Sequence, residues 1–179
     1  MNIHQLQVSY DRAEDRLRLR LSTTAGDEFR VFLTRRFLRA LWPQLQHAVE
    51  AAVAVKAPAE DSRREVLAFE REKALAESDF SKPFVEPSAT APRRFPLGET
   101  PILATRGGLR MVTPGSYRLV LEPVSGPGVD IGLDSRLMHS ICGLIANSMR
   151  ESDWNLPFPE ARGTQQPAEN VPAAPRVLN

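Results

Sequence analysis

The chain has 179 residues, 42% of them apolar, which suits one domain or two small ones with a hydrophobic core. Its 23 Lys and Arg residues balance 22 Asp and Glu residues, and the net charge of +1 gives no overall reason to expect polyanion binding. The single cysteine, Cys142, excludes an intrachain disulfide and favours a reducing compartment. No apolar run approaches the roughly 20 residues of a membrane helix, and the first residues lack signal-peptide character. We therefore expect a cytoplasmic protein with no membrane partner.

The first fifty residues predict three strands followed by a helix. Residues 3–10 form a candidate first strand, and two later segments alternate apolar and polar residues, as half-buried strands do. Their apolar positions are Leu17, Leu19 and Leu21, and then Phe29, Val31 and Leu33. Gly26 lies between these two segments and predicts a turn.

Four arginines occupy the polar positions of these two segments. If the apolar residues point inward, the outer face of the sheet carries Arg16, Arg18, Arg20 and Arg30. Such a face is a candidate site for nucleic acid or another anion. We favour the alternative, a solvated sheet face whose arginines are partly neutralised by nearby acids. Those acids are Glu14, Asp15, Asp27 and Glu28.

A helix is predicted after Leu33, with Thr34 as its N-cap. Its apolar stripe consists of Phe37, Leu38, Leu41, Trp42, Leu45 and Val49. Pro43 should either kink this helix or begin a new one. The first turns also carry Arg35, Arg36 and Arg39. Their positive charges oppose the helix dipole, which favours an anion-binding site at this end of the helix.

Residues 116–150 repeat the pattern of residues 16–50 without a gap. The apolar positions of the strands and of the helical stripe match, Trp42 lies opposite Cys142, and Phe32 lies opposite Gly132. Residues 101–112 supply a strand before this second copy, with a bulge or kink expected at Gly107. We interpret the pattern as a duplicated supersecondary unit.

The predicted fold class is α+β, a tandem duplication of a strand-strand-strand-helix unit with antiparallel sheets related by a pseudo-two-fold axis. Residues 1–57 form the first repeat and residues 97–152 the second. Residues 58–96 combine a charged helix with a proline-rich linker, and residues 153–179 form a proline-rich flexible tail. In that tail Trp154, Leu156 and Phe158 alternate, and we expect them to dock on the chain's own domain or, less favoured, on a partner.

Catalytic and metal-binding patterns are poor. His139 and Cys142 are three positions apart on one helix, but the repeat matches Cys142 with Trp42 and His139 with Arg39. A core thiol beside an exposed histidine is therefore the expectation, rather than a catalytic pair. No His or Cys has neighbours at metal-ligand spacing, so we predict no enzyme activity, no metal and no cofactor.

Two resemblances accompany these patterns. Two strand-rich halves that each end in a helix resemble the Whirly and PUR-type single-stranded nucleic-acid-binding architectures, which use four strands in each half. The phrases FLTRRFLRALWPQL and FPLGETPILATR resemble those of a family of uncharacterised bacterial proteins, which implies no activity.

The sequence favours a non-enzymatic binding or adaptor protein with an unknown protein partner, and a homo-oligomer stays open. The alternative is a single-stranded DNA- or RNA-binding protein that uses the four outer arginines. The matching outer positions of the second copy are Ser116, Arg118, Val120 and Asp130, so the basic face belongs to one half only. This asymmetry favours the adaptor.

Overall fold

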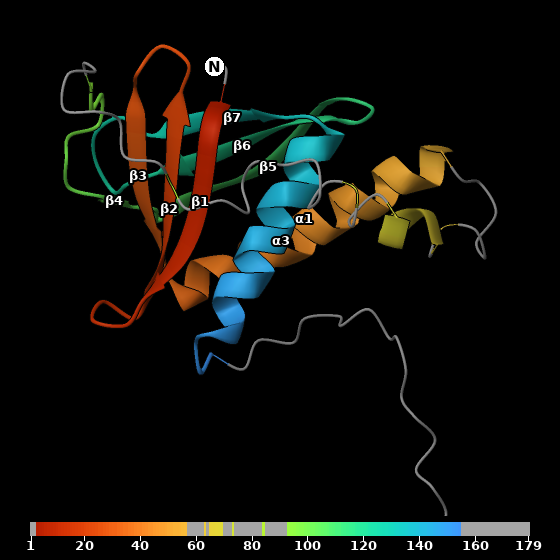
Figure 1. The fold of residues 1–179 in the computed structure, drawn as a ribbon, viewed down its shortest axis with the longest axis horizontal. Helices are drawn as coiled ribbons and strands as arrows, with labels where there is room; N and C mark the ends of the chain where they lie inside the picture. Colours follow the sequence, from red (N-terminus) through yellow and green to blue (C-terminus); the bar gives the residue numbers. More distant parts are fainter. Residues whose placement is uncertain are drawn as a thin grey trace, which may run out of the picture.

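Two β-sheets and two long helices make up the fold, which is α+β (Figure 1). The structure is a computed structural model and describes residues 3–56, 63, 65–69, 73, 84 and 93–154. The first half contains β1 (Ile3–Asp11), β2 (Arg16–Thr23), β3 (Glu28–Leu33) and α1 (Arg35–Lys56). The second contains β4 (Ile102–Leu103), β5 (Arg106–Thr113), β6 (Ser116–Glu122), β7 (Val129–Leu133) and α3 (Ser135–Arg150).

The two sheets share their register at an offset of 100 residues. The first sheet has the order β1-β2-β3-β4 and the second the order β5-β6-β7. Leu19 lies opposite Val31 across β2 and β3, and Leu119 lies opposite Ile131 across β6 and β7. The alternating apolar residues of both pairs face the core, as the sequence pattern predicts.

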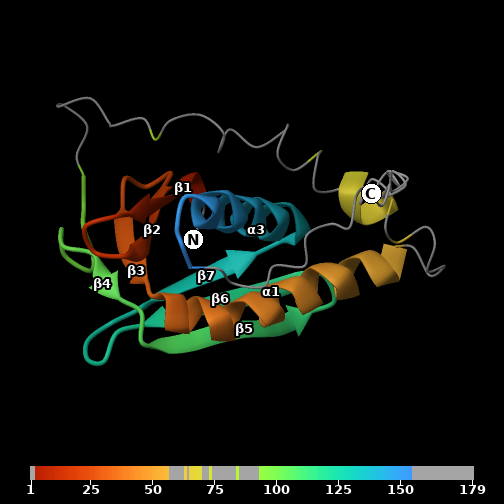
Figure 2. The ribbon, with the colours of Figure 1, turned by 90° about the horizontal axis from the view of Figure 1, so that it is seen from below.

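Each helix covers the sheet of the other half. α1 packs along β5, whereas α3 packs against β1 and β2 and also contacts α1 (Figure 2). Side-chain hydrogen bonds connect the halves. The Ser148 hydroxyl donates to the carbonyl of Val8 at 2.8 Å, and the Tyr117 hydroxyl donates to the carbonyl of Ala48 at 3.2 Å. The halves are therefore interlocked around one core rather than placed side by side.

The strand predicted over residues 101–112 is divided between the two sheets. Ile102 and Leu103 pair in parallel with β3, and the backbone N–H of Thr105 then donates to the carbonyl of Glu122 in the second sheet at 2.8 Å. Just beyond this crossing, Gly107 has φ 135°, and a Cβ there would lie 2.0 Å from the Val120 carbonyl oxygen. Glycine is required at this kink because any side chain would collide with β6.

Both predicted helix starts are confirmed. The side-chain oxygens of Thr34 and Asp134 accept hydrogen bonds from the N–H groups of Phe37 and Leu137 at 3.1 and 2.8 Å. Pro43 lies inside α1, which continues through it as one helix. Trp42, on the predicted stripe, is only 9% exposed.

The predicted exposure of His139 is wrong. His139 is buried, and Cys142 is half-buried rather than a core thiol. The prediction placed only one face of α3 against other elements. In the structure α3 contacts β1, β2, β7 and α1, so more of its circumference is enclosed.

Part of the predicted charged helix is described. Arg63, residues 65–69 and Lys73 are helical, and Phe69 is exposed. The predictions for the rest of residues 57–92, and those for Leu156, Phe158 and the tail after Trp154, lie outside the described residues.

Candidate functional site

The four arginines predicted on the outer side of the first sheet, here called the arginine face, do lie on one side of β2 and β3. Arg16, Arg18 and Arg20 alternate with the buried leucines of β2, and Arg30 lies opposite Arg20 on β3. All four side chains are half-buried rather than fully exposed. Contacts within the chain therefore decide what this face can bind.

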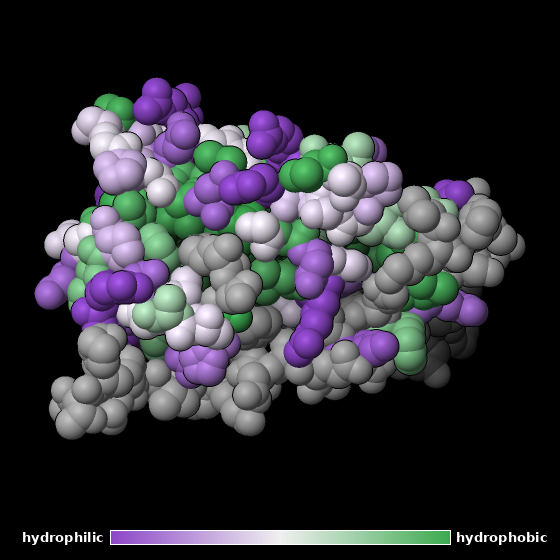
Figure 3. Space-filling model, turned by 90° about the horizontal axis from the view of Figure 1, so that it is seen from above, coloured by the Kyte–Doolittle hydropathy of each residue, from purple (hydrophilic) through white to green (hydrophobic). Residues whose placement is uncertain are grey.

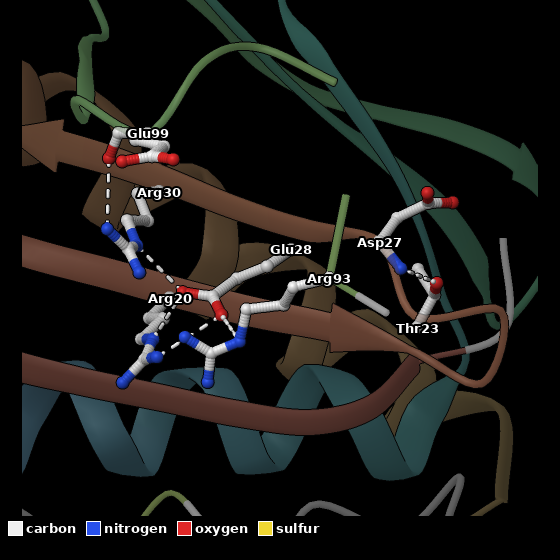
Figure 4. Close-up of polar contacts among 7 residues, drawn as sticks. All are labelled: Arg20, Thr23, Asp27, Glu28, Arg30, Arg93 and Glu99. Carbon is white, nitrogen blue, oxygen red and sulfur yellow. Dashed lines mark hydrogen bonds and ion pairs between the residues drawn. The ribbon is translucent and has the colours of Figure 1, made fainter. Parts of the chain in front are cut away.

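A buried carboxylate organises one end of the arginine face (Figure 4). Glu28 is 2% exposed, and its Oε1 accepts hydrogen bonds from Arg20 Nε at 2.6 Å and Arg30 Nε at 2.7 Å. Arg93 Nε lies 3.3 Å from Glu28 Oε2. Arg30 also donates to the carbonyl of Glu99 at 3.0 Å. Three guanidinium groups therefore share one buried carboxylate.

The electrostatics of Glu28 follow from these contacts. Burial by itself would raise the pKa of this carboxyl group, because the charged form loses hydration. The hydrogen bonds and positive charges of Arg20 and Arg30 outweigh burial and lower the pKa of Glu28 below its usual range. Glu28 is thus ionised at neutral pH and serves as the internal counterion of the cluster.

Aromatic rings cover much of the same face. Phe32 is 9% exposed, and the guanidinium groups of Arg16 and Arg18 lie 5.6 and 5.5 Å from its ring centroid. The guanidinium group of Arg20 lies 3.8 Å from the centroid of Phe84, and that of Arg30 lies 4.8 Å from the centroid of Phe95. These are cation–π distances. The rings that could stack on nucleic-acid bases therefore already contact arginines of this chain.

The remaining arginines of the face also have acidic partners. Arg16 pairs with Glu14 at 3.1 Å, and Glu14 is one of the nearby acids that the sequence pattern offered as a neutralising partner. Arg18 pairs with Asp11. Asp27 pairs instead with Arg94, at 2.8 Å. The pattern did not reveal Arg93, Arg94 and Phe95, because contacts made by a linker segment leave no periodic signal in the sequence.

The helix-start arginines form a separate group. Arg35, Arg36 and Arg39 are exposed on α1, and no ion pair to them is present among the described residues. The positive charge of Arg35 contributes to lowering the pKa of Asp15 in the β1–β2 turn. The structure therefore does not join these three arginines to the arginine face as one site.

Trp154 docks on this same turn. It is 3% exposed, and its indole N–H donates to Asp15 Oδ1 at 2.6 Å. Its ring meets Tyr10 edge-on, with centroids 5.8 Å apart, and the Tyr10 hydroxyl also donates to Asp15 at 2.7 Å. The hydrogen bonds from Tyr10 and then Trp154 lower the pKa of Asp15.

The outer side of the second sheet is much barer. β5 is exposed at most of its positions, and Met111 and Val112 at its hairpin end are 61% and 54% exposed. We call these two residues the hairpin patch. On the outer side of β6 and β7, Arg118 and Asp130 form an exposed ion pair at 2.8 Å, and a Cβ at Gly132 would meet open space. Figure 3 shows the surface of the whole molecule from above, where hydrophobic residues are interspersed with hydrophilic ones.

Comparisons with known proteins give no assignment. No family model, no curated protein and no solved structure matches this chain. Within the described residues no group of three or more His, Cys, Asp or Glu side chains could hold a metal ion. None of the described helices is long and apolar enough to cross a membrane.

Proposed function

We propose that this protein is a non-enzymatic adaptor that binds a protein partner through the exposed hairpin end of β5, centred on the hairpin patch. The observation that carries the proposal is the exposure of two adjacent large apolar side chains, Met111 and Val112, on a strand that is exposed along most of its length. Adjacent exposed apolar residues beside charged ones are typical of the centre and rim of protein interfaces.

The arginine face supports this choice by elimination. Its acidic partners and aromatic covers are supplied by the chain itself, so an incoming polyanion would have to displace Glu28 or Phe32, both almost fully buried. Proteins that hold single strands instead present exposed aromatic rings beside unpaired cations. Single-stranded nucleic acid stays the alternative partner, and the experiment below separates the two.

The experiment is a pull-down with the intact protein from its native cells, with and without nuclease. The test variant is Met111→Glu combined with Val112→Glu, which places two charges at the hairpin patch. The matched control is Val124→Glu, because Val124 is 77% exposed and lies in the loop at the opposite end of β6.

We expect the wild type and the control to retain the same protein partner after nuclease treatment, and the test variant to lose at least 90% of it. If both variants retained the partner equally, the hairpin patch would not be the binding surface. A partner that disappears with nuclease would favour the nucleic-acid alternative.

A further inference from the structure

The two sheets differ at the edge strand that precedes each long helix. In the first sheet, the segment that contains β4 covers β3, where Ile102 and Leu103 pair in parallel and the N–H of Ala104 donates to the carbonyl of Phe32 at 3.0 Å. In the second sheet β7 holds the equivalent edge, and no described strand pairs with its outer side. An unpaired edge is a template for strand addition, which proteins usually prevent by covering the edge.

The hydrogen bonds of β6 show which groups of β7 point outward. The carbonyl of Glu122 accepts from the N–H of Thr105, just before β5, at 2.8 Å. Because successive residues of a strand direct their main-chain groups to opposite sides, the odd-numbered residues of β6 bond to β7, and Ile131 bonds to them. Asp130 and Gly132 therefore direct their N–H and C=O groups away from the sheet. No described residue forms a hydrogen bond with these outward groups.

The outer face of the same sheet carries a row of unbalanced positive charge. Arg110 of β5 lies directly opposite Arg118 of β6, and Arg118 lies opposite Gly132 of β7. Asp130 pairs with Arg118 at 2.8 Å, whereas no ion pair to Arg110 is present among the described residues. Like charges directly opposite on neighbouring strands are destabilising. A carboxylate beyond Gly132 would offset this repulsion, and the open space over that glycine leaves the sheet face clear between the carboxylate and Arg118.

We propose that a second copy of this chain adds at the edge of β7, so that the two β7 strands pair antiparallel about a two-fold axis at Ile131. In this register Asp130 of each copy lies opposite Gly132 of the other, and their outward N–H and C=O groups bond to each other. The two three-stranded sheets then form one continuous sheet. The edge of β7 and the hairpin patch of β5 belong to opposite edges of the sheet, so the inference does not depend on the proposed function.

The charges of the outer face favour a second copy as the occupant. The antiparallel register extends the row of Arg110, Arg118 and Gly132 into Asp130 of the other copy. The Cα atoms of Arg118 and that aspartate are two strand spacings apart, about 10 Å, which the long arginine side chain can bridge across the bare glycine. The reciprocal row gains a carboxylate in the same way, and one surface supplies both sides of the contact, as a two-fold interface requires.

The size of the contact predicts its strength. β7 has 5 residues, so the pairing of two such strands gives an interface smaller than that of a stable permanent dimer. We therefore expect a weak dimer whose population depends on protein concentration.

Sedimentation of the full chain over a wide range of concentrations measures the association, and residue-resolved amide hydrogen exchange locates it. We expect the wild type to dimerise as its concentration rises. The N–H groups of Asp130 and Gly132 should then become at least about tenfold better protected. The N–H of Ile131, which bonds to β6, should be equally protected at every concentration.

Two substitutions at one position separate the edge from the rest of the fold. Gly132→Pro removes an outward donor but none of the hydrogen bonds between β6 and β7, and should lower the association constant at least about tenfold. Gly132→Ala is the matched control. It keeps the donor and places its methyl group in open space on the sheet face, so it should associate like the wild type. Urea unfolding at low protein concentration shows whether each monomer is folded.

The charge row has its own test. Asp130→Lys brings a third cation into each row and should lower the association constant at least about tenfold. Combining it with Arg118→Glu reverses the pair and should restore association. This comparison also carries the test if Gly132→Pro does not fold.

Four results would overturn the proposal. The wild type could stay monomeric at every concentration, or Gly132→Pro could fold and associate as well as the wild type. Protection of Asp130 and Gly132 that does not depend on concentration would show that the edge is covered within one chain. Equal association of Asp130→Lys and of the variant with both charges reversed would exclude the two-fold register. None of these results depends on whether a partner binds the hairpin patch.

Discussion

The two sheets have matching inner faces and contrasting outer faces. Inside, Leu19 and Leu119 occupy equivalent buried positions, and each sheet is covered by the helix of the other half. Outside, the first sheet carries ion pairs and aromatic covers around Glu28, whereas the second leaves the hairpin patch exposed. A repeated unit can therefore preserve its core while one outer surface forms many contacts within the chain and the other stays more exposed.

The largest effect should come from the shared interior. Trp42→Ala is expected to lower the free energy of unfolding by about 3–5 kcal/mol, because it removes a large buried ring and leaves a cavity between the helices and sheets. Urea unfolding of the full chain measures this. An unchanged unfolding midpoint would show that the interior is not packed around α1 as described.

The next largest effect should separate the two outer faces. Glu28→Gln leaves the surrounding arginines without their counterion and is expected to lower the free energy of unfolding by about 3 kcal/mol. The matched change on the second sheet is Asp130→Asn, which breaks the exposed pair with Arg118 and should cost less than about 1 kcal/mol. Similar losses in the two variants would erase the contrast between the faces.

A smaller effect is expected where the tail begins. Trp154→Ala should lower the free energy of unfolding by about 2 kcal/mol, since the ring is buried but its segment lies at the edge of the fold. In the Trp154→Ala variant, loss of the ring contact should also make the Tyr10 side chain more accessible to solvent. A Trp154 fluorescence spectrum typical of full solvent exposure, obtained as the difference between the wild type and Trp154→Ala, would contradict this docking.

The smallest expected effect is a change in the pH dependence of stability. The pKa of Glu28 is lowered by folding, so its contribution is present above the usual glutamate pKa and is lost as the pH falls through the lowered value. The free energy of unfolding should therefore decline on acidification, and Glu28→Gln should flatten that decline. Urea titrations between pH 7 and pH 3 compare the two slopes, and parallel slopes would assign the acid sensitivity to other carboxyl groups.

Periodicity predicted the parts of the fold that depend on which side chains face inward. The alternation around Leu19 and Leu119 located four strands, and Thr34 and Asp134 located both helix starts. It could not predict that the helices exchange sheets, because an apolar stripe specifies burial without specifying a partner. The enclosure of His139 follows from that exchange and was missed for the same reason.

The candidate site was predictable only in part. Alternation with leucines placed Arg16, Arg18 and Arg20 on one face, and proximity in sequence suggested Glu28 as a neutralising acid. The contributions of Arg93 and Phe95 come from a linker more than sixty residues away along the chain. Such contacts depend on the path of irregular backbone, for which local sequence patterns carry no rule.

Binding of a labelled single-stranded oligonucleotide at low salt tests the contrast between the faces most directly. If the arginine face is satisfied by the chain's own acids and rings, the wild type should produce no mobility shift at micromolar protein. The result that would contradict the account is a shift that weakens when Arg16, Arg18 and Arg20 are replaced by Ala. In that case the salt slope should fall by about 2–3 units, because each lost phosphate contact releases about one fewer counterion.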